Sequence, residues 1–545
     1  MLSASRLVSG SKVWGHAVAV VGPLPGVLSR VGLTREVTTK RLQGKILPLS
    51  TSVVLVVSGL LFSFWSYRLH LGFVGAWRTP GDFWATYQSS VALVQGHFSQ
   101  VYSQSTGLVT FPAISYLLAP AAVLTSALHL GLGYPAGPYV HPSAWLVAGP
   151  FEMMIGSLPL FAVDRCAERL GLSTRRRWAL ALAEAAILAN VTVLWGHPED
   201  AISIALVLYA VLAVQDGNHR RAAWLLGVAV AFQPLALLAI PALGARFSWR
   251  EALRLLPVVV VPSLLVLAPL IGAEPASVWH ALVNQPNYPL LNHVTPLTRF
   301  APGLPGGIVV MAGPDRLVAV AVAAIVGVLI CRRSADIEQM LWALPVVFFI
   351  RLVFETTIAA FYVWPVLAVV LLLSARRGRV PLITVAVAAN LMTWFQLIPW
   401  EGTWGWWTLT IGSLAVMLVL TRPRRVRLAV RMSSHHVRPR RWSINQVWAL
   451  DLILCALIAC ADALLGHRII LMGLLVAIPC GALVTGRWSR TAISGALAVG
   501  LAVALGVPDG IWATATQLAY IGAIAAVALA CSVWALTTER VTGRL

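Results

Sequence analysis

The stretch ILPLSTSVVLVVSGLLFSFWSY occupies residues 46–67 and is the first long apolar segment of the chain. A helix of this length, at about 1.5 Å per residue, crosses the hydrocarbon core of a bilayer. Similar segments recur throughout the 545 residues, which are 59% hydrophobic, have a mean hydropathy of +0.81 and are only 11% charged. Soluble domains carry about 25% charged residues. The sequence therefore predicts an all-α polytopic membrane protein.

The net charge of +20 comes mainly from arginines in short segments between the apolar spans, such as residues 175–177 and 422–441. This is the positive-inside pattern, and the basic clusters suit anionic lipid headgroups, so we expect membrane lipids and no nucleic acid as partners. Basic residues before Ile46 place the N-terminus in the cytoplasm and the segment after Tyr67 outside. The six cysteines form no C-x-x-C pair, which argues against a zinc site or a disulfide framework.

Four regions follow from the spans and the charges between them. Residues 1–45 form a basic cytoplasmic tail, and residues 46–420 form a membrane core with two long external loops. Residues 421–446 form a basic cytoplasmic linker, and residues 447–545 carry four further spans of unknown role. We expect a multi-pass protein of the cell membrane.

Two apolar segments are ambiguous. Gly107–Leu128 is interrupted by Pro112 and Pro120, and a full span there would place the arginine triplet outside. We therefore interpret it as an interfacial or partly embedded helix pair. Ala222–Leu243 is broken at Gln233-Pro234, so it forms either a re-entrant hairpin or a kinked span.

The first external loop contains Gly81-Asp82-Phe83-Trp84, with a lone carboxylate at the membrane surface. A carboxylate in that position can deprotonate an alcohol, which makes Asp82 the leading candidate for chemistry. The alternative is that Asp82 caps a helix starting at Phe83. The two interpretations are compatible, because a capping aspartate can also face a cleft.

Residues 196–200, Gly-His-Pro-Glu-Asp, form a very short external turn between two spans. Proline at the first helical position followed by acids is typical of a helix start. The functional alternative is that His197, Glu199 and Asp200 lie beside Asp82 and bind an acceptor hydroxyl or a divalent cation. The spacing fits no specific metal motif, so no cofactor is predicted beyond this possible cation.

The second external loop, residues 272–305, contains His293 and Arg299. An external arginine runs against the charge pattern, and arginine binds phosphate in a bidentate manner, so Arg299 is a candidate clamp for a lipid phosphate. The alternative is an arginine that snorkels at the start of the next span.

Arg351 and Glu355 lie one helical turn apart near the outer end of a span. They either pair with each other or line the cavity, and Tyr362 follows on the next span. Because ions inside a membrane are costly, we favour the cavity.

Six stretches together resemble the GT-C glycosyltransferases, in particular glycosyltransferase family 87, the polyprenyl-phosphate-mannose-dependent alpha-mannosyltransferases. The resemblance covers roughly residues 46–420, and its motifs are loose. The chain departs from the family's pattern at Gln233, where such proteins often carry lysine, and at His293, where glutamine is expected. The matching stretches are Gly81–Trp84 with Tyr87, Leu93–Tyr102, Phe111–Pro120, Leu226-Gly227 with Phe232–Pro234, Asn292–Arg299 and Phe361–Pro365.

The resemblance implies a GT-C-like helical core in which Asp82 is the catalytic base. The implied reaction moves a sugar, with mannose expected, from a polyprenyl-phosphate donor to a cell-envelope glycolipid or glycan acceptor at the external face. Direct displacement implies inversion. The expected substrate-binding residues are His197, Glu199, Asp200, His293, Arg299, Arg351, Glu355 and Tyr362.

Two other functions remain open. A transporter or flippase of polyprenyl-linked glycans predicts polar residues near mid-membrane in several spans, and often internal repeats. An inactive relative would act as a scaffold through its last four spans. The enzyme interpretation requires Asp82 and the turn at residues 196–200 to face one external cavity with Arg299.

Overall fold

The computed structural model describes most of the chain beyond residue 44. The described residues are 45–68, 81–103, 108, 110–131, 143–284, 286–287, 292–301, 310–311, 315–332, 336–396, 403–423, 444–465, 472–482 and 485–542. Contacts divide the chain after Ser50 into two units. Everything below concerns the second unit, Thr51–Leu545, apart from the first residues of α4.

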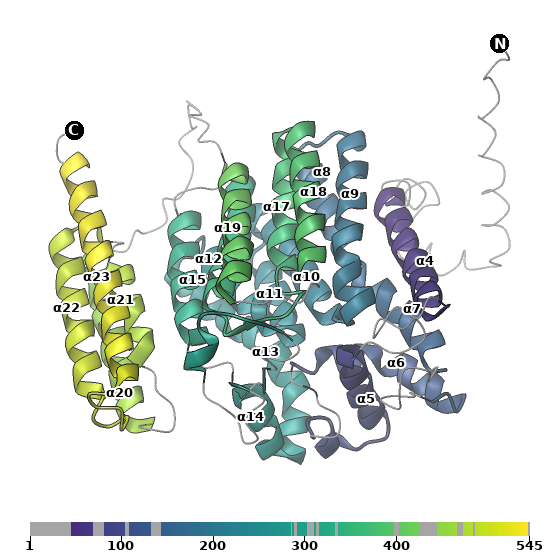
Figure 1. Ribbon diagram of the computed structural model, residues 1–545, viewed down its shortest axis with the longest axis horizontal. Coiled ribbons are helices and arrows are strands. Elements are labelled where there is room, and N and C mark those ends of the chain that lie inside the picture. Colours follow the sequence, from purple (N-terminus) through teal and green to yellow (C-terminus); the bar gives the residue numbers. More distant parts are fainter. Residues whose placement is uncertain are drawn as a thin grey trace, which may run out of the picture. The chain divides into compact units, whose positions relative to one another are not determined.

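The described residues are almost entirely helical (Figure 1). The helices are α4 (Ile46–Arg68), α5 (Gly81–Val94), α6 (Ala113–Ala127), α7 (Trp145–Gly156), α8 (Leu158–Arg169), α9 (Thr174–Ala189), α10 (Pro198–Gln215), α11 (His219–Phe232), α12 (Ala239–Gly244), α13 (Trp249–Ala273), α14 (Pro275–Asn284), α15 (Asp315–Arg332), α16 (Ile337–Phe354), α17 (Trp364–Arg377), α18 (Arg379–Phe395), α19 (Thr403–Thr421), α20 (Ile444–Leu465), α21 (Ala477–Ala482), α22 (Trp488–Leu505) and α23 (Ala515–Thr542).

Short 3-10 or π-helical segments and two-residue strands complete the fold. The short helical segments are η1 (Phe98–Gln100), η2 (Asn190–Trp195), η3 (Pro234–Leu238), η4 (Thr298–Phe300) and η6 (Met472–Val476). The strands are β1 (Pro286–Asn287), β2 (His293–Val294), β3 (Val310–Met311) and β4 (Thr357–Ile358). They pair antiparallel as β1 with β3 and β2 with β4.

Seven of the described helices or helix pairs are long and apolar enough to cross a membrane, and the predicted all-α polytopic membrane protein is confirmed at that level. They are Trp145–Arg169, Thr174–Trp195, Pro198–Gln215, Trp249–Ala273, Ile337–Phe354, Thr403–Thr421 and Trp488–Leu505.

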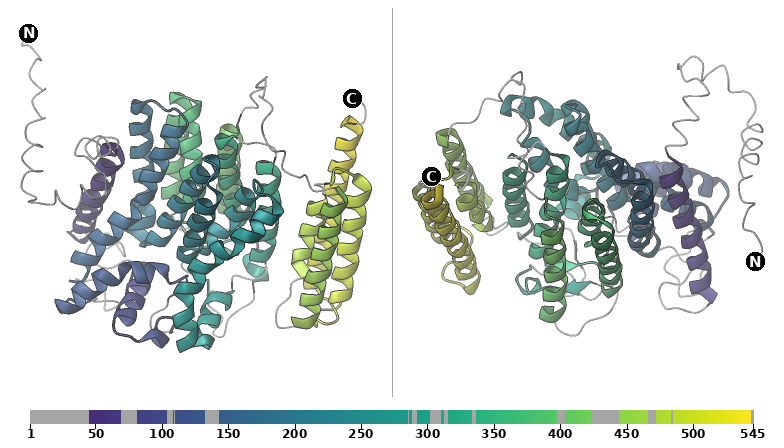
Figure 2. Two further views of the ribbon diagram at one scale, coloured as in Figure 1. Left: turned by 180° about the vertical axis from the view of Figure 1, so that it is seen from behind. Right: turned by 90° about the horizontal axis from the view of Figure 1, so that it is seen from above.

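The core is organised around α17, in which every residue from Trp364 to Ala375 is buried. Helices α9, α16, α18 and α19 pack against it, and α10 packs between α8 and α11 (Figures 1 and 2). Helices α11 and α13 approach closely at Gly227, because a Cβ there would lie only 2.4 Å from the carbonyl oxygen of Val259. Such close backbone contact requires a small residue.

Three local expectations differ from the structure or are refined by it. In place of the predicted helix pair in Gly107–Leu128, the described residues form the single helix α6, which accommodates Pro120. The predicted break at Gln233 is confirmed, since α11 ends there and η3 begins at Pro234. This break agrees with both the hairpin and the kinked span. The second predicted C-terminal span is not one continuous helix but η6 followed by α21.

A second apolar cluster joins the last part of the chain to α15, since it includes Cys455, Met472 and Leu475 together with Val318. The predicted limits at residues 45, 420 and 446 stay predictions. Residues 1–44 and 424–443, which contain most of the predicted tail and linker, lie outside the described residues.

Candidate active site

The turn after α9 determines where His197 lies. Beyond Ala189 the backbone widens into the π-helical segment η2, and Gly196 then adopts a φ of 73° in the left-handed region. Glycine takes up that conformation without the steric cost of a Cβ. His197 follows as the N-cap of α10, and Pro198 begins the helix. The predicted helix start at residues 196–200 is therefore confirmed.

His197 bridges two carboxylates from separate parts of the chain. Its Nε2 lies 3.0 Å from Oδ2 of Asp82, and its Nδ1 lies 2.7 Å from Oε1 of Glu199. The Asp82 side chain is 49% exposed, the imidazole 16% and the Glu199 side chain 2%. The three groups thus form a row that runs from an accessible carboxylate to a buried one.

Asp82 lies in the first turn of α5, which begins at Gly81, and not at the predicted N-cap. An acid in the first turn still complements the helix dipole. Aromatic packing fixes this end of α5, because the ring of Phe83 contacts those of Tyr87 and Trp145 at 5.8 and 5.5 Å between centroids. The Tyr87 hydroxyl also hydrogen-bonds to Thr125 of α6. Asp82 therefore projects from a well-anchored helix.

The environment of His197 favours its charged form. Burial disfavours the imidazolium, but the negative charge of Glu199 and the hydrogen bonds to Asp82 and Glu199 outweigh it. As a result, the pKa of His197 is raised well above its usual value. The ring also packs on Phe361, with centroids 3.8 Å apart. The two carboxylates thus stabilise His197 as an imidazolium between them.

A second polar group adjoins this row. The amide Nε2 of Gln233 donates to Oδ1 of Asp200 at 2.8 Å. Arg351 donates through Nε to Oε1 of the fully buried Glu355 at 2.5 Å, and its guanidinium lies 4.6 Å from the centre of the Tyr362 ring. Asp200 interacts electrostatically with Arg351 and with His197, which joins the two groups into one cluster.

The second loop is tied to the same region through its backbone. Strand β2 pairs with β4, which places His293 opposite Ile358. The hydroxyl of Thr295 donates to the carbonyl oxygen of Glu355 at 2.7 Å. The His293 ring stacks on Trp406 with centroids 4.1 Å apart.

His293 itself faces α18 and α19. Its Nε2 lies 2.6 Å from the carbonyl oxygen of Gln396, so this nitrogen donates and carries the proton. Burial lowers the pKa of His293 despite this hydrogen bond, so the ring is neutral at pH 7. Arg299 lies on η4 with an exposed side chain.

Most of the predicted site residues therefore come together, from α5, α10, α16 and the segment after β4. The residues joined by direct or electrostatic contacts are Asp82, His197, Glu199, Asp200, Arg351, Glu355 and Tyr362. The expected common cavity with Arg299 stays a prediction.

Sequence reasoning missed two members of this region. Phe361 supports the His197 ring, and its only signal in the sequence is that it begins the matching stretch Phe361–Pro365. Glu152 lies in the middle of α7, is fully buried and interacts electrostatically with Glu199 and His197. An acid in the middle of an apolar span is a recognisable functional signal.

A divalent cation at His197, Glu199 and Asp200 would have to replace the contacts that the His197 ring makes with the carboxylates. His197, Glu199 and Asp200 offer donor atoms within 4.8 Å of one another. Both ring nitrogens of His197, however, already contact carboxylate oxygens, and an imidazolium has no lone pair for a metal. The imidazolium of His197 itself provides the positive charge beside Asp82 and Glu199.

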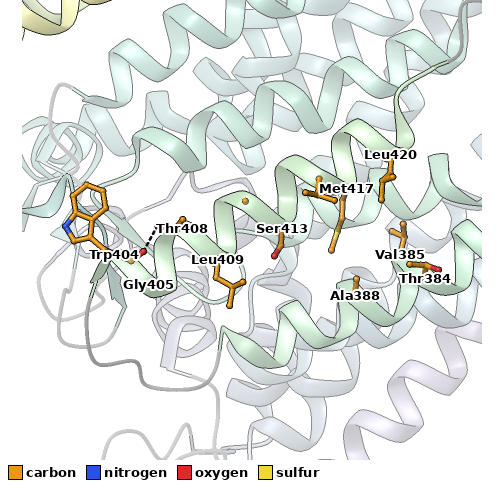
Figure 3. A pocket seen from close by; sticks show the side chains of 12 residues that line it. Thr384, Val385, Ala388, Trp404, Gly405, Thr408, Leu409, Ser413, Met417 and Leu420 are labelled. Carbon is orange, nitrogen blue, oxygen red and sulfur yellow. Dashed lines mark hydrogen bonds between the residues drawn. The ribbon is translucent and has the colours of Figure 1, made fainter.

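A surface groove lies elsewhere, between α18 and α19 (Figure 3). Its volume is about 930 Å³, and its walls are mainly apolar or small side chains such as Val385, Ala388, Leu409 and Met417. None of the cluster residues lines it. The groove is therefore not part of the candidate active site.

The chain was compared with protein-family models, with curated proteins and with solved structures. None of the three comparisons found a significant match.

Proposed function

We propose that the protein is an integral membrane glycosyltransferase that uses a polyprenyl-phosphate sugar, with mannose as the expected sugar. The acceptor is a glycolipid or glycan of the cell envelope, and the reaction takes place at the outer face. The observation that carries the proposal is the contact between Asp82 and His197, residues 115 positions apart in the sequence. It joins the lone carboxylate of the first loop to the short acidic turn and its buried charges.

Asp82 has the exposure and the setting of a general base. Its half-exposed carboxylate can reach an acceptor hydroxyl, and the contact with the His197 ring orients it. In the proposed reaction the acceptor oxygen bonds to the anomeric carbon as the carbon–phosphate oxygen bond breaks. The hydroxyl proton passes to Asp82, and the bonding electrons leave with the phosphate. Direct displacement inverts the anomeric configuration.

The phosphate that leaves needs positive charge and hydrogen-bond donors. Arg351 donates to Glu355 through Nε, and the Nη groups of a guanidinium are further donors that could bind a phosphate. Tyr362 packs against the guanidinium and restricts its orientation. Arg299, which is exposed on η4, supplies a second cation in the same loop region.

The proposal is tested by incubating the purified protein with labelled polyprenyl-phosphate sugars and lipid-linked acceptors. We expect transfer of one sugar and an inverted anomeric centre in the product, determined by NMR. Retained configuration would contradict the displacement mechanism, and the lack of any product across the donor panel would contradict the function.

A transporter of polyprenyl-linked glycans is the second candidate. The observation that favours it is the presence of buried acids, Glu152 and Glu184, inside α7 and α9. Ionisable groups at such positions often mark transport or proton pathways. Reconstituted vesicles with a fluorescent polyprenyl-linked glycan separate the candidates, since a transporter moves the lipid between leaflets and the proposed enzyme does not.

A further inference from the structure

Glu152 is a carboxyl group buried without a partner. Its side chain is 0% exposed in the middle of α7, and neither of its oxygens has a hydrogen-bond partner among the described residues. An ionised carboxylate without donors is strongly disfavoured in such surroundings. The group therefore either carries a proton or receives donors that ordinary packing does not supply.

Helix α7, which carries Glu152, packs against η2 and α10, the two elements on either side of His197. One turn beyond Glu152, Gly156 packs so closely on η2 that a Cβ there would lie 2.5 Å from Cγ2 of Thr192 and 3.8 Å from Pro198. Glu152 shares this face of α7, since residues four apart lie above one another. It interacts electrostatically with both Glu199 and His197.

Glu199 likewise has a buried oxygen that lacks a hydrogen-bond donor among the described residues. Its Oε1 accepts from Nδ1 of His197, but its buried Oε2 has no hydrogen-bond partner among the described residues. The nearby charged groups are engaged elsewhere, because Asp200 accepts from Gln233 and Arg351 pairs with Glu355. Two carboxyl groups thus interact in a buried place where three of their four oxygens have no donor within the described part of the chain. One proton, shared between them, supplies the missing donor.

We propose that Glu152 is a neutral acid that donates a hydrogen bond to Oε2 of Glu199 and holds that carboxylate aligned on His197. The row then has four members, with the accessible base Asp82 at one end and Glu152 at the other. The arrangement extends the logic of catalytic triads, in which a buried acid orients a histidine. Glu152 is a positioning residue that acts through Glu199 and His197. Its effect on catalysis rests on the proposed function, but its protonation does not.

The first test is infrared difference spectroscopy of the purified protein against Glu152→Gln. We expect the variant to lose a protonated-carboxyl C=O band that shifts in D2O. Glu184→Gln is the matched control, because Glu184 is 2% exposed in α9 and burial, not a charged neighbour, dominates its electrostatics. The control should leave the Glu152 band in place. If Glu152→Gln loses no such band, Glu152 is ionised and the proposal is overturned.

The second test asks whether residue 152 acts through its hydrogen-bond donor. Glutamine keeps the size and an N–H donor, whereas Glu152→Met keeps the size but has no donor. Because hydrogen bonds to charged groups are strong, we expect a kcat roughly tenfold to hundredfold lower in the methionine variant, with KM unchanged. The glutamine variant should retain nearly the wild-type kcat and pH profile. Equal kcat values in both variants overturn the positioning role.

A third readout is independent of sugar transfer. The ¹⁵N resonances of His197 should report an imidazolium in the wild type and in Glu152→Gln, and should move toward a neutral ring in Glu152→Met. Unchanged resonances in Glu152→Met contradict the inference even if the protein proves to transfer no sugar. A failure of the proposed function and a failure of this inference are therefore distinguishable.

Discussion

Replacing His197 by glutamine removes the cation that lies between Asp82 and Glu199 while keeping a polar side chain. The two ion pairs contribute differently to the free energy of unfolding. The pair with Asp82, whose side chain is 49% exposed, contributes at most about 1 kcal/mol because solvent screens it. The pair with Glu199 joins side chains exposed 16% and 2%, and breaking a buried pair costs about 3–5 kcal/mol. We expect His197→Gln to lower the free energy of unfolding by about 3 kcal/mol near pH 6, since the amide retains one donor.

The pH dependence of this loss follows from the raised pKa of His197 in the folded state. Folding favours the protonated ring, so its contribution is complete below the unfolded pKa of about 6.5. It disappears as the pH rises through the raised folded value. The stability difference between the wild type and the variant should therefore shrink as the pH rises from 6 into the alkaline range.

The assay is reversible unfolding in mixed micelles, followed by tryptophan fluorescence at a series of pH values. His97→Gln is the matched control, because His97 is exposed in the loop after α5 and should leave the curve unchanged. A stability difference that is constant or grows with pH would refute the assignment of an imidazolium between two carboxylates.

Three further substitutions test other parts of the structure. Gly196→Ala places a Cβ on a backbone with φ of 73°, and we expect a loss of about 1–2 kcal/mol in unfolding together with a lower kcat as His197 shifts. Gly227→Val forces α11 from α13, and its overpacking should cost about 1–3 kcal/mol in chemical unfolding, with normal stability contradicting the close contact. Arg177→Leu leaves Asp164, which is 3% exposed and accepts two bonds of 2.7 Å, without its cation. We expect about 3–5 kcal/mol of destabilisation with kcat per folded molecule unchanged, as this pair lies outside the cluster.

The membrane class and the main helices could be predicted from the sequence because lipid leaves few choices. Long apolar segments such as Trp249–Ala273 must satisfy their backbone internally and so form helices. Proline positions were less decisive. Pro120 lies inside one continuous helix, whereas Pro234 ends one, because Gln233 before it adopts an extended backbone.

The chemistry-bearing residues were recognisable individually, but their pairing was not. Asp82 and His197 are joined only by the packing of α5 beside the turn after η2, which depends on aromatic contacts that no short motif encodes. The partner of Asp200, the Gln233 amide, stood out only as a departure from the resembled family. Arg351 and Glu355 pair with each other, as residues four apart on a helix do, which confirms the alternative that was not favoured. The favoured role in lining the cavity stays a prediction.

The N-cap role expected for Asp82 was wrong in detail, since α5 begins at Gly81, two residues before the expected start at Phe83. Helix ends depend on backbone geometry that varies by a residue or two and is poorly encoded. Glu152 was missed because the candidate residues were taken mainly from the external loops, and Glu152 lies inside a span.

The most direct measurement of the central claim is the rate of sugar transfer from a labelled polyprenyl-phosphate donor by the wild type and by Asp82→Asn. The amide preserves the shape of the side chain but cannot take up the proton of the acceptor hydroxyl. We therefore predict a kcat about 10²–10⁴-fold lower, with an unchanged free energy of unfolding. Asp216→Asn is the matched control, because Asp216 is an exposed acid paired with Arg169 at the other end of α10. Wild-type transfer by folded Asp82→Asn would contradict the account.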